Sequence, residues 1–310
     1  MGMDVQVKFG IAIPQIWSAP EERAASLHDF LGRAEALGYH SAWVQEQILG
    51  RANTYEPVTL LAYAAAATRA LCLGTSVLIT PLRSPVQLAK SLSTLDHLSG
   101  GRLIVGVGIG ANTRVYPAFG ITPEGRVRRF VEGMEVMRRL WTEERVSFEG
   151  RFWKLENAAM APKPLQKPHP PIWFGAREPA ALRRAAQLGD GWMGAGSATT
   201  AQFKDQLARL RAFLTEAKRD PATFSIAKRV YVAVDANKGR ALERLRQWFG
   251  AYYNKPEMAD AVCLAGGAAE VAEGLRELGA AGAELILLNP VFDAMHHLEV
   301  LAGEVMPLVR

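Results

Sequence analysis

Short apolar runs alternate with segments of helical periodicity along almost the whole 310-residue chain. Strand-length runs separated by helix-length segments are typical of βα units, in which successive strands lie parallel in one sheet or barrel. We count eight such runs. The expected strands are residues 7–13, 41–45, 71–79, 102–107, 171–175, 191–194, 225–234 and 283–288.

The segments between these runs carry apolar residues three or four apart, which predicts helices that pack one face on a core. Phe203, Leu207, Leu210 and Leu214 form one such stripe. Capping signals agree with the periodicity. Ser84-Pro85 reads as an N-cap followed by proline in the first turn, and Gly100-Gly101 closes the same helix.

Eight βα units in 310 residues predict a (β/α)8 TIM barrel with insertions at the carboxyl face, as one domain over residues 1–310. A doubly wound nucleotide-binding fold would carry G-x-G-x-x-G after its first strand, and here that strand ends in Ile13-Pro-Gln-Ile-Trp17. The glycine cluster from Gly106 to Gly110 follows the fourth strand instead. It is consistent with close approach of a ligand or with tight packing at the barrel mouth.

Residues 145–170 interrupt the alternation. The stretch from Val146 to Trp153 predicts a hairpin, and the four prolines that follow, Pro162, Pro164, Pro168 and Pro170, cannot continue a helix or a central strand. We therefore expect an insertion at about 145–170 that covers part of the barrel mouth or rim.

Charge and cysteine content exclude several classes of protein. Lysine plus arginine (36) exceed aspartate plus glutamate (31) by 5, spread along the chain, which favours small anionic ligands over nucleic acid. Cys72 and Cys263 lie 191 positions apart, without disulfide or metal spacing. The longest apolar run, residues 60–67, is too short to span a bilayer, so we expect a cytoplasmic protein that binds no membrane.

The predicted strand ends hold few groups for acid-base chemistry, because Glu46 is the one carboxylate on an early strand end. None of the six histidines falls at a strand end, so we expect no metal site, and no G-x-S-x-G elbow occurs. Such a mouth suits a bound cofactor that does the chemistry. Arg83, Arg114 and Arg177 on one face would favour a phosphorylated ligand, and Arg177 immediately precedes a predicted helix N-terminus.

Several motifs resemble one family. They are the stretches 73–85, 94–110, 140–142, 146–150, 170–175 and 189–192, with sequences such as Leu73-Gly-Thr-Ser-Val-Leu-Ile-Thr-Pro81 and Pro170-Pro-Ile-Trp-Phe-Gly175. Together they resemble the bacterial luciferase-like superfamily of flavin-dependent and F420-dependent oxidoreductases. The resemblance implies a TIM barrel that binds the deazaflavin coenzyme F420, or FMN, at its carboxyl face. The stretch 74–78 looks closest to the F420-dependent branch, in which a strand bulge with a non-prolyl cis peptide backs the ring.

By this resemblance, Ser76 and Val77 would lie behind the ring, with the cis bond between them and Val77 not facing the helices. Glu46 would lie near the polar edge of the ring and is a candidate catalytic residue together with Gln47. The residues expected to contact the rest of the cofactor are Gly108, Ile109, Gly110, Asn112, Phe174, Gly175, Ala176 and Arg177. We also expect Trp17, Phe174 and Trp192 to form a groove that excludes water, with Gln47 as an orienting donor.

Two departures bear on the reaction. Many relatives carry histidine where Gln47 stands, and Ala111 replaces an acid of the sugar-phosphate dehydrogenases of the family. We therefore expect hydride transfer between F420 and a small organic substrate other than by the glucose 6-phosphate mechanism. The alternatives are an FMN-dependent monooxygenase of the same fold and a non-catalytic flavin-binding protein. The resemblance also implies a homodimer.

Overall fold

Eight parallel strands close into a barrel in the computed structural model, which describes residues 6–17, 24–50 and 52–309. Each strand pairs with the next, and pairings of β7 with β10 and of β14 with β1 complete the ring. The predicted (β/α)8 barrel and all eight predicted strands are confirmed. The barrel strands are β1 (Lys8–Ala12), β3 (Ser41–Val44), β5 (Cys72–Thr75), β7 (Leu103–Gly108), β10 (Ile172–Gly175), β11 (Gly191–Gly194), β12 (Ser225–Val234) and β14 (Leu285–Asn289).

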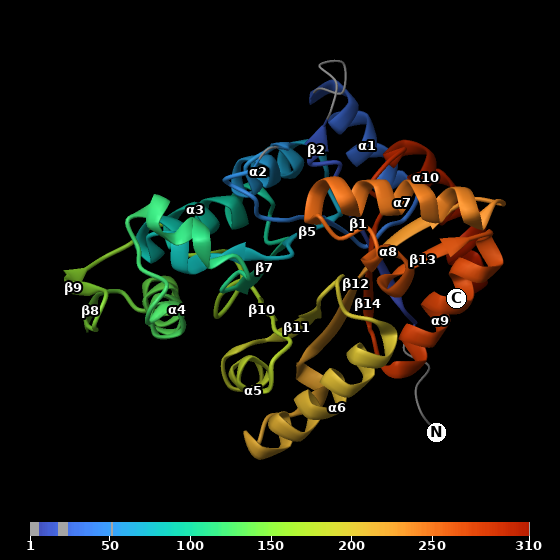
Figure 1. Ribbon diagram of the computed structural model, residues 1–310. Helices are drawn as coiled ribbons and strands as arrows, with labels where there is room; N and C mark the ends of the chain where they lie inside the picture. The colour runs from blue at the N-terminus through green and yellow to red at the C-terminus, as the bar shows by residue number, and fades with distance from the viewer. Residues whose placement is uncertain (1–5, 18–23, 51, 310) are drawn as a thin grey trace.

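Helices follow the strands and cover the outside of the barrel (Figure 1). The Ser84 side chain accepts a hydrogen bond from the Gln87 N–H and Pro85 opens the helix, as predicted. No helix of the described residues is long and apolar enough to cross a membrane. The helices are α1 (Ala24–Ala36), α2 (Pro57–Ala67), α3 (Pro85–Leu98), α4 (Arg126–Thr142), α5 (Pro179–Leu188), α6 (Thr200–Glu216), α7 (Lys238–Tyr253), α8 (Met258–Val262), α9 (Ala268–Ala281), α10 (Ala294–Val300) and α11 (Met306–Val309).

Two tryptophan rings fill the inside of the barrel. Trp43 from β3 and Trp173 from β10 lie 5.4 Å apart between ring centroids, among the buried side chains of Ile104, Met193 and Leu287. The strand positions beside them have to be glycine, since a Cβ at Gly74 would lie 2.3 Å from the Trp43 ring. The barrel is therefore a packed core below its mouth.

The expected hairpin in residues 145–170 is present as β8 (Val146–Glu149) and β9 (Lys154–Ala158). It lies beside α4, at the edge of the molecule in Figure 1. Near its turn, the Trp153 ring lies 4.4 Å from the Arg129 guanidinium, and Arg129 also donates to the carbonyl of Pro81 at the rim. The segment that follows packs on α3, where Ser93 donates to the carbonyl of Pro162. The hairpin turn reaches the carboxyl rim, while the proline-rich segment lies along the outer helices.

A second insertion stands between β12 and α9, and the sequence patterns did not separate it from the barrel units. It consists of α7, α8 and the short strand β13 (Cys263–Gly266), which pairs with the last four residues of β12. Its buried side chains, among them Leu245 and Phe249, form a small core with Tyr231 of β12. This insertion places α7 beside the carboxyl ends of the strands.

Candidate active site

A cavity of about 510 Å³ opens at the carboxyl ends of β1, β3, β12 and β14. Its size is in the range of small-molecule sites, and its position is where barrel enzymes place their active sites. The two-stranded ribbon of β2 (Ile16–Trp17) and β4 (Asn53–Thr54) lies at this end and contributes Ile16 and Trp17 to the lining. Further lining side chains are Gln15, Phe30, Trp43, Gln45, Ser76, Arg229, Arg244, Trp248, Leu287, Asn289, Phe292, Asp293 and Met295.

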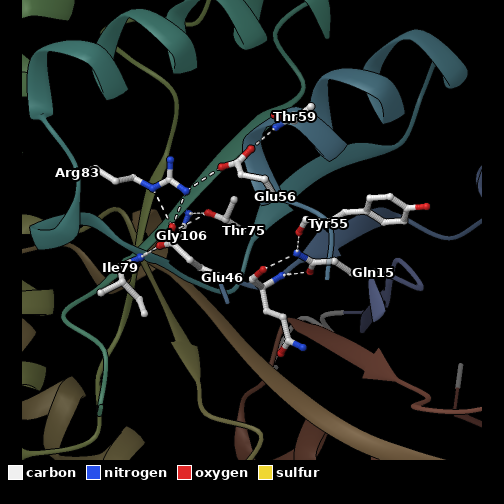
Figure 2. A network of polar contacts seen from close by, with 10 residues as sticks. Gln15, Glu46, Tyr55, Glu56, Thr59, Thr75, Ile79, Arg83 and Gly106 are labelled. Carbon is white, nitrogen blue, oxygen red and sulfur yellow. Dashed lines mark hydrogen bonds and ion pairs between the residues drawn. The ribbon is translucent and has the colours of Figure 1, made fainter. Parts of the chain in front are cut away.

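Gln15 ties together the loops that form this mouth (Figure 2). Its side-chain amide donates to the carbonyls of Gln45 at 2.7 Å and Tyr55 at 2.6 Å, and its amide oxygen accepts from the Gln45 N–H at 2.8 Å. Gln15 is 3% exposed. Each of its three contacts joins the end of β1 to another segment, so Gln15 fixes the distance between the first two barrel strands at the mouth.

Glu46 lies in a buried ion pair, beside the cavity and not in its lining (Figure 2). Its carboxylate accepts from Arg83 and from the Ile79 N–H, and its side chain has 0% exposure. Arg83 also binds Glu56, which caps α2. Burial alone would lower the pKa of Arg83, but the two carboxylates outweigh burial and raise it. The expectation that Arg83 is available to a phosphate is therefore wrong, because two carboxylates already neutralise it.

Gln47 does not line the cavity either. Its side-chain oxygen is buried and has no hydrogen-bond partner in the described part of the chain. The amide nitrogen lies against Gly50, where an added Cβ would be only 2.0 Å away. Neither candidate catalytic residue faces this cavity. Their catalytic roles remain predictions.

Strand β5 ends at Thr75, and β6 (Leu78–Ile79) continues beside β7. The peptide bond between Ser76 and Val77 is cis, as predicted. Val77 points toward the neighbouring strands: added Cβ atoms at Gly108 and Gly175 would lie 2.8 and 3.0 Å from its methyl groups. Its expected orientation, away from the helices, is confirmed.

The other predicted cofactor residues lie on the β7–β10 side of the mouth, while Ser76 alone of the predicted set lines the cavity. Ile109 and Gly110 are half-buried, and exposed Asn112 caps the 3-10 helix η2 (Thr113–Phe119). Arg177 is exposed and donates to the Ser197 hydroxyl at 3.2 Å. Ala176 is 6% exposed.

Two of the three rings expected to form a groove face the helices instead. Phe174 packs edge-on against Phe130 of α4, with centroids 5.5 Å apart, and Trp192 stacks on Phe203 of α6 at 5.3 Å. Side chains alternate across a strand, so the neighbours of these residues point inward. The Phe174 and Trp192 rings therefore lie in the core between barrel and helices, and that part of the groove prediction is wrong. Trp17 does line the cavity.

The central polar side chain of the cavity, Arg229 on β12, was not predicted. Its guanidinium crosses toward β3 and the bulge, donating to the Gln45 side-chain oxygen at 2.7 Å and weakly to the Ser76 carbonyl at 3.4 Å. It also donates to the Tyr231 hydroxyl at 3.2 Å. The Asn289 amide oxygen lies 2.6 Å from Nη2 in the amide orientation that pairs donors with acceptors. The one sequence feature that could have pointed to Arg229 is the position of this charged residue in the middle of a predicted strand of ten residues.

Arg244 and Asp293 close another side of the cavity. Their ion pair joins α7 to the start of α10, and the Arg244 guanidinium lies 3.9 Å from the centre of the Phe292 ring. The hydrogen bond from Arg244 lowers the pKa of Asp293. The partner of Asp293 lies on α7, an element that the sequence patterns did not separate from the barrel units.

Lys228, next to Arg229, faces outward and gives a pH-dependent prediction. Its amine donates to the Ala198 carbonyl at 2.9 Å, and burial lowers the pKa of Lys228 to about 7 from an ordinary value near 10.5. Between pH 7 and pH 10.5, Lys228 is therefore protonated in the unfolded chain and largely neutral in the folded protein. We therefore expect stability to rise with pH over this range, by at most about 1.4 kcal/mol per pH unit.

Urea unfolding of wild type and Lys228→Met from pH 7.5 to 9.5 checks this. The variant should lose part of the upward slope, and Lys204→Met, which removes a half-exposed lysine, should keep it. Equal slopes in wild type and Lys228→Met would contradict the prediction.

Comparison with known proteins agrees with the geometry. The model of the family described as luciferase-like monooxygenase matches residues 3–285. The chain belongs to the luciferase-like monooxygenase family. The resemblance seen in the sequence is thereby confirmed.

The chain is similar to two relatives and to one further structure that shares its fold. An F420-dependent glucose-6-phosphate dehydrogenase of Kineococcus radiotolerans is 32% identical over 240 residues, covering 74% of this chain and 70% of the relative. The structure of monooxygenase RslO1 from Streptomyces bottropensis is 28% identical, with a TM-score of 0.79 over 97% of this chain and 99% of that one. An F420-dependent secondary alcohol dehydrogenase, solved with an F420-acetone adduct, has a TM-score of 0.87 over 98% and 99% of the two chains at 22% identity.

Proposed function

We propose that this luciferase-like protein transfers a hydride between coenzyme F420 and a small organic substrate. The main support for this proposal is the cavity at the mouth of the barrel. A cavity of about 510 Å³, lined largely by apolar side chains, adjoins the bulge of Ser76 and Val77 and contains no unpaired carboxylate or histidine among its described lining residues. Such a cavity offers position and exclusion of water, which suits chemistry that a cofactor brings. The 32% identity to an F420-dependent dehydrogenase supports the choice of cofactor.

The residues present are compatible with a flat ring at the bulge. Val77 is half-buried and its methyl groups pack onto Gly108 and Gly175, where any larger side chain would displace it. Val77 can therefore offer an apolar surface to one face of a ring. In this proposal the amides of Gly175 and Ala176, with Arg177, hold the phosphate of the cofactor tail.

F420 would supply hydride donation and acceptance at its ring. The chain's own residues then have positioning roles. Trp17 and Trp248 exclude water from the cavity, and Gln15 holds the ends of β1 and β3 at a fixed separation. Holding the reacting carbons within about 3 to 3.5 Å is worth several kcal/mol of activation free energy in well-oriented reactions.

Titration of the purified chain with F420 and, separately, with FMN tests the cofactor. We expect F420 to bind more tightly, with ring fluorescence as the readout. If FMN binds at least tenfold more tightly, a difference of about 1.4 kcal/mol, the proposal gives way to the alternative.

That alternative is an FMN-dependent monooxygenase, and the 28% identity to monooxygenase RslO1 over nearly the full length favours it as second candidate. Oxygen uptake by the FMN-loaded, reduced protein, dependent on an organic substrate, would support it.

The phosphate site gives a separate expected result. Arg177→Ala should weaken binding of phosphorylated F420 by about three- to tenfold, since one exposed guanidinium contributes about 1 kcal/mol to an anion. The unphosphorylated ring compound should bind the variant as it binds the wild type. Calorimetry with both ligands measures this, and an equal loss for both would place the phosphate elsewhere.

The homodimer stays a prediction of the family resemblance. Light scattering at low micromolar concentration should give twice the mass of the 33.8 kDa chain.

A further inference from the structure

The guanidinium of Arg229 carries a charge that no carboxylate balances within the described residues. Its hydrogen-bond partners in the described part of the chain are neutral: the Gln45 amide, the Ser76 carbonyl, the Tyr231 hydroxyl and the Asn289 amide. Arg229 lines the cavity and is half-buried. A partly buried charge held only by neutral acceptors favours an anion beside it.

The contacts leave one nitrogen of Arg229 available. Nη2 is anchored by Gln45 at 2.7 Å, Tyr231 at 3.2 Å and Asn289 at 2.6 Å, whereas Nη1 has one weak contact, 3.4 Å to the Ser76 carbonyl. The Tyr231 ring lies 5.0 Å from the guanidinium carbon, and the Tyr231 hydroxyl is itself hydrogen-bonded to Tyr253 at 2.7 Å. The side chain is therefore fixed on one edge and has donors to offer on the other.

The remaining charges of the cavity lining cancel. Among its described lining residues only Arg229, Arg244 and Asp293 ionise, and Arg244 and Asp293 form an ion pair with each other. The lining thus carries a net charge of +1. One unbalanced guanidinium matches a monoanion, whereas a phosphate dianion would need a second free cation.

The apolar side chains of the lining indicate what kind of molecule would carry this anionic group. Trp17, Phe30, Trp248 and Phe292 supply aromatic surface, and Leu287 and Met295 supply aliphatic surface. The polar lining side chains Gln15, Gln45 and Asn289 already form hydrogen bonds within the protein, so a sugar ring would leave several hydroxyls without partners. We propose that Arg229 binds the carboxylate of the substrate, and that the substrate is a small organic acid with a flat apolar body. This inference rests on the proposed function only in naming the bound acid as the substrate.

Binding to the cofactor-free full-length protein tests the inference without any turnover. Isothermal calorimetry would compare cinnamate, the neutral cinnamamide of the same shape, and inorganic phosphate. We expect cinnamate to bind wild type at least tenfold more tightly than cinnamamide, and phosphate more weakly than cinnamate. Arg229→Gln should remove the preference for cinnamate over cinnamamide. Arg145→Gln, which removes one exposed positive charge on the hairpin insertion, should keep it.

Three outcomes would overturn the inference, and a fourth would overturn only the proposed cofactor. Equal binding of cinnamate and cinnamamide by wild type would do so even if Arg229→Gln failed to fold. Tighter binding of phosphate that is lost in Arg229→Gln and kept in Arg177→Ala would make the ligand a phosphorylated compound. An equal loss of cinnamate and of the bare deazaflavin ring in Arg229→Gln would assign the guanidinium to the ring. A failed F420 titration with an intact cinnamate preference would reject the proposed cofactor and leave the acid site standing.

Discussion

Replacing Arg83 with methionine is expected to destabilise the protein by about 3 to 5 kcal/mol. The Glu46 side chain has 0% exposure, and Arg83 is the cation that neutralises it. Without Arg83 the buried carboxylate keeps the Ile79 N–H but loses its counter-ion. Leaving a buried charge unpaired costs far more than removing the attraction itself. Urea unfolding of the purified variant at neutral pH measures the loss.

Two matched variants separate this explanation from a general loss of packing. Adding Glu46→Leu to Arg83→Met should recover a large part of the stability, because the unpaired charge is then gone. Lys154→Met removes an ion pair whose side chains are 69% and 81% exposed, and should change stability by less than about 1 kcal/mol. A loss for Arg83→Met no larger than that for Lys154→Met would show that Glu46 is not held by this pair.

Gly106→Ala is expected to destabilise the barrel by at least about 3 kcal/mol, at the upper end of the range for overpacked cores. An added Cβ would lie 1.7 Å from the carbonyl oxygen of Thr75, a backbone atom that no rotamer change can move. Thr75 and Gly106 also exchange two hydrogen bonds, of 2.7 and 2.8 Å, through the Thr75 hydroxyl. Forcing the strands apart would break both, and thermal or urea unfolding would report the loss.

Gly32→Ala is the matched control, since Gly32 is exposed in α1 and an added Cβ meets nothing within 4 Å. Alanine should leave stability unchanged or raise it by about 0.5 to 1 kcal/mol, as in any helix interior. A Gly106→Ala variant as stable as the wild type would mean that β5 and β7 can separate at this level without cost. Of the two interpretations of the glycine cluster, tight packing is the one that holds at Gly106.

Sequence patterns predicted the order of the eight barrel strands and the helices between them, but not the insertion of α7, α8 and β13. Eight apolar runs divided by helical stripes were enough for the barrel, because parallel strands are apolar on both faces and each needs a covering helix. Capping residues such as Ser84 fixed helix starts, since their hydrogen bonds are local. The bulge at Ser76 and Val77 followed from family resemblance, against the local preference for an extended strand.

Which side chains meet depends on the closed barrel and not on local sequence patterns. Phe174 and Trp192 stand on strands that the sequence located, yet their rings face helices, because closure of the barrel determines which side of a short apolar strand points inward. Residues distant in the sequence also determine which charged side chains are neutralised: Arg83 pairs with Glu46, 37 positions away, and Arg244 pairs with Asp293, 49 positions away. Arg229 lies inside an apolar strand pattern, and only the barrel brings Gln45, 184 positions away, to its guanidinium. Contacts between residues so distant depend on the packing of the whole chain, and no local pattern encodes them.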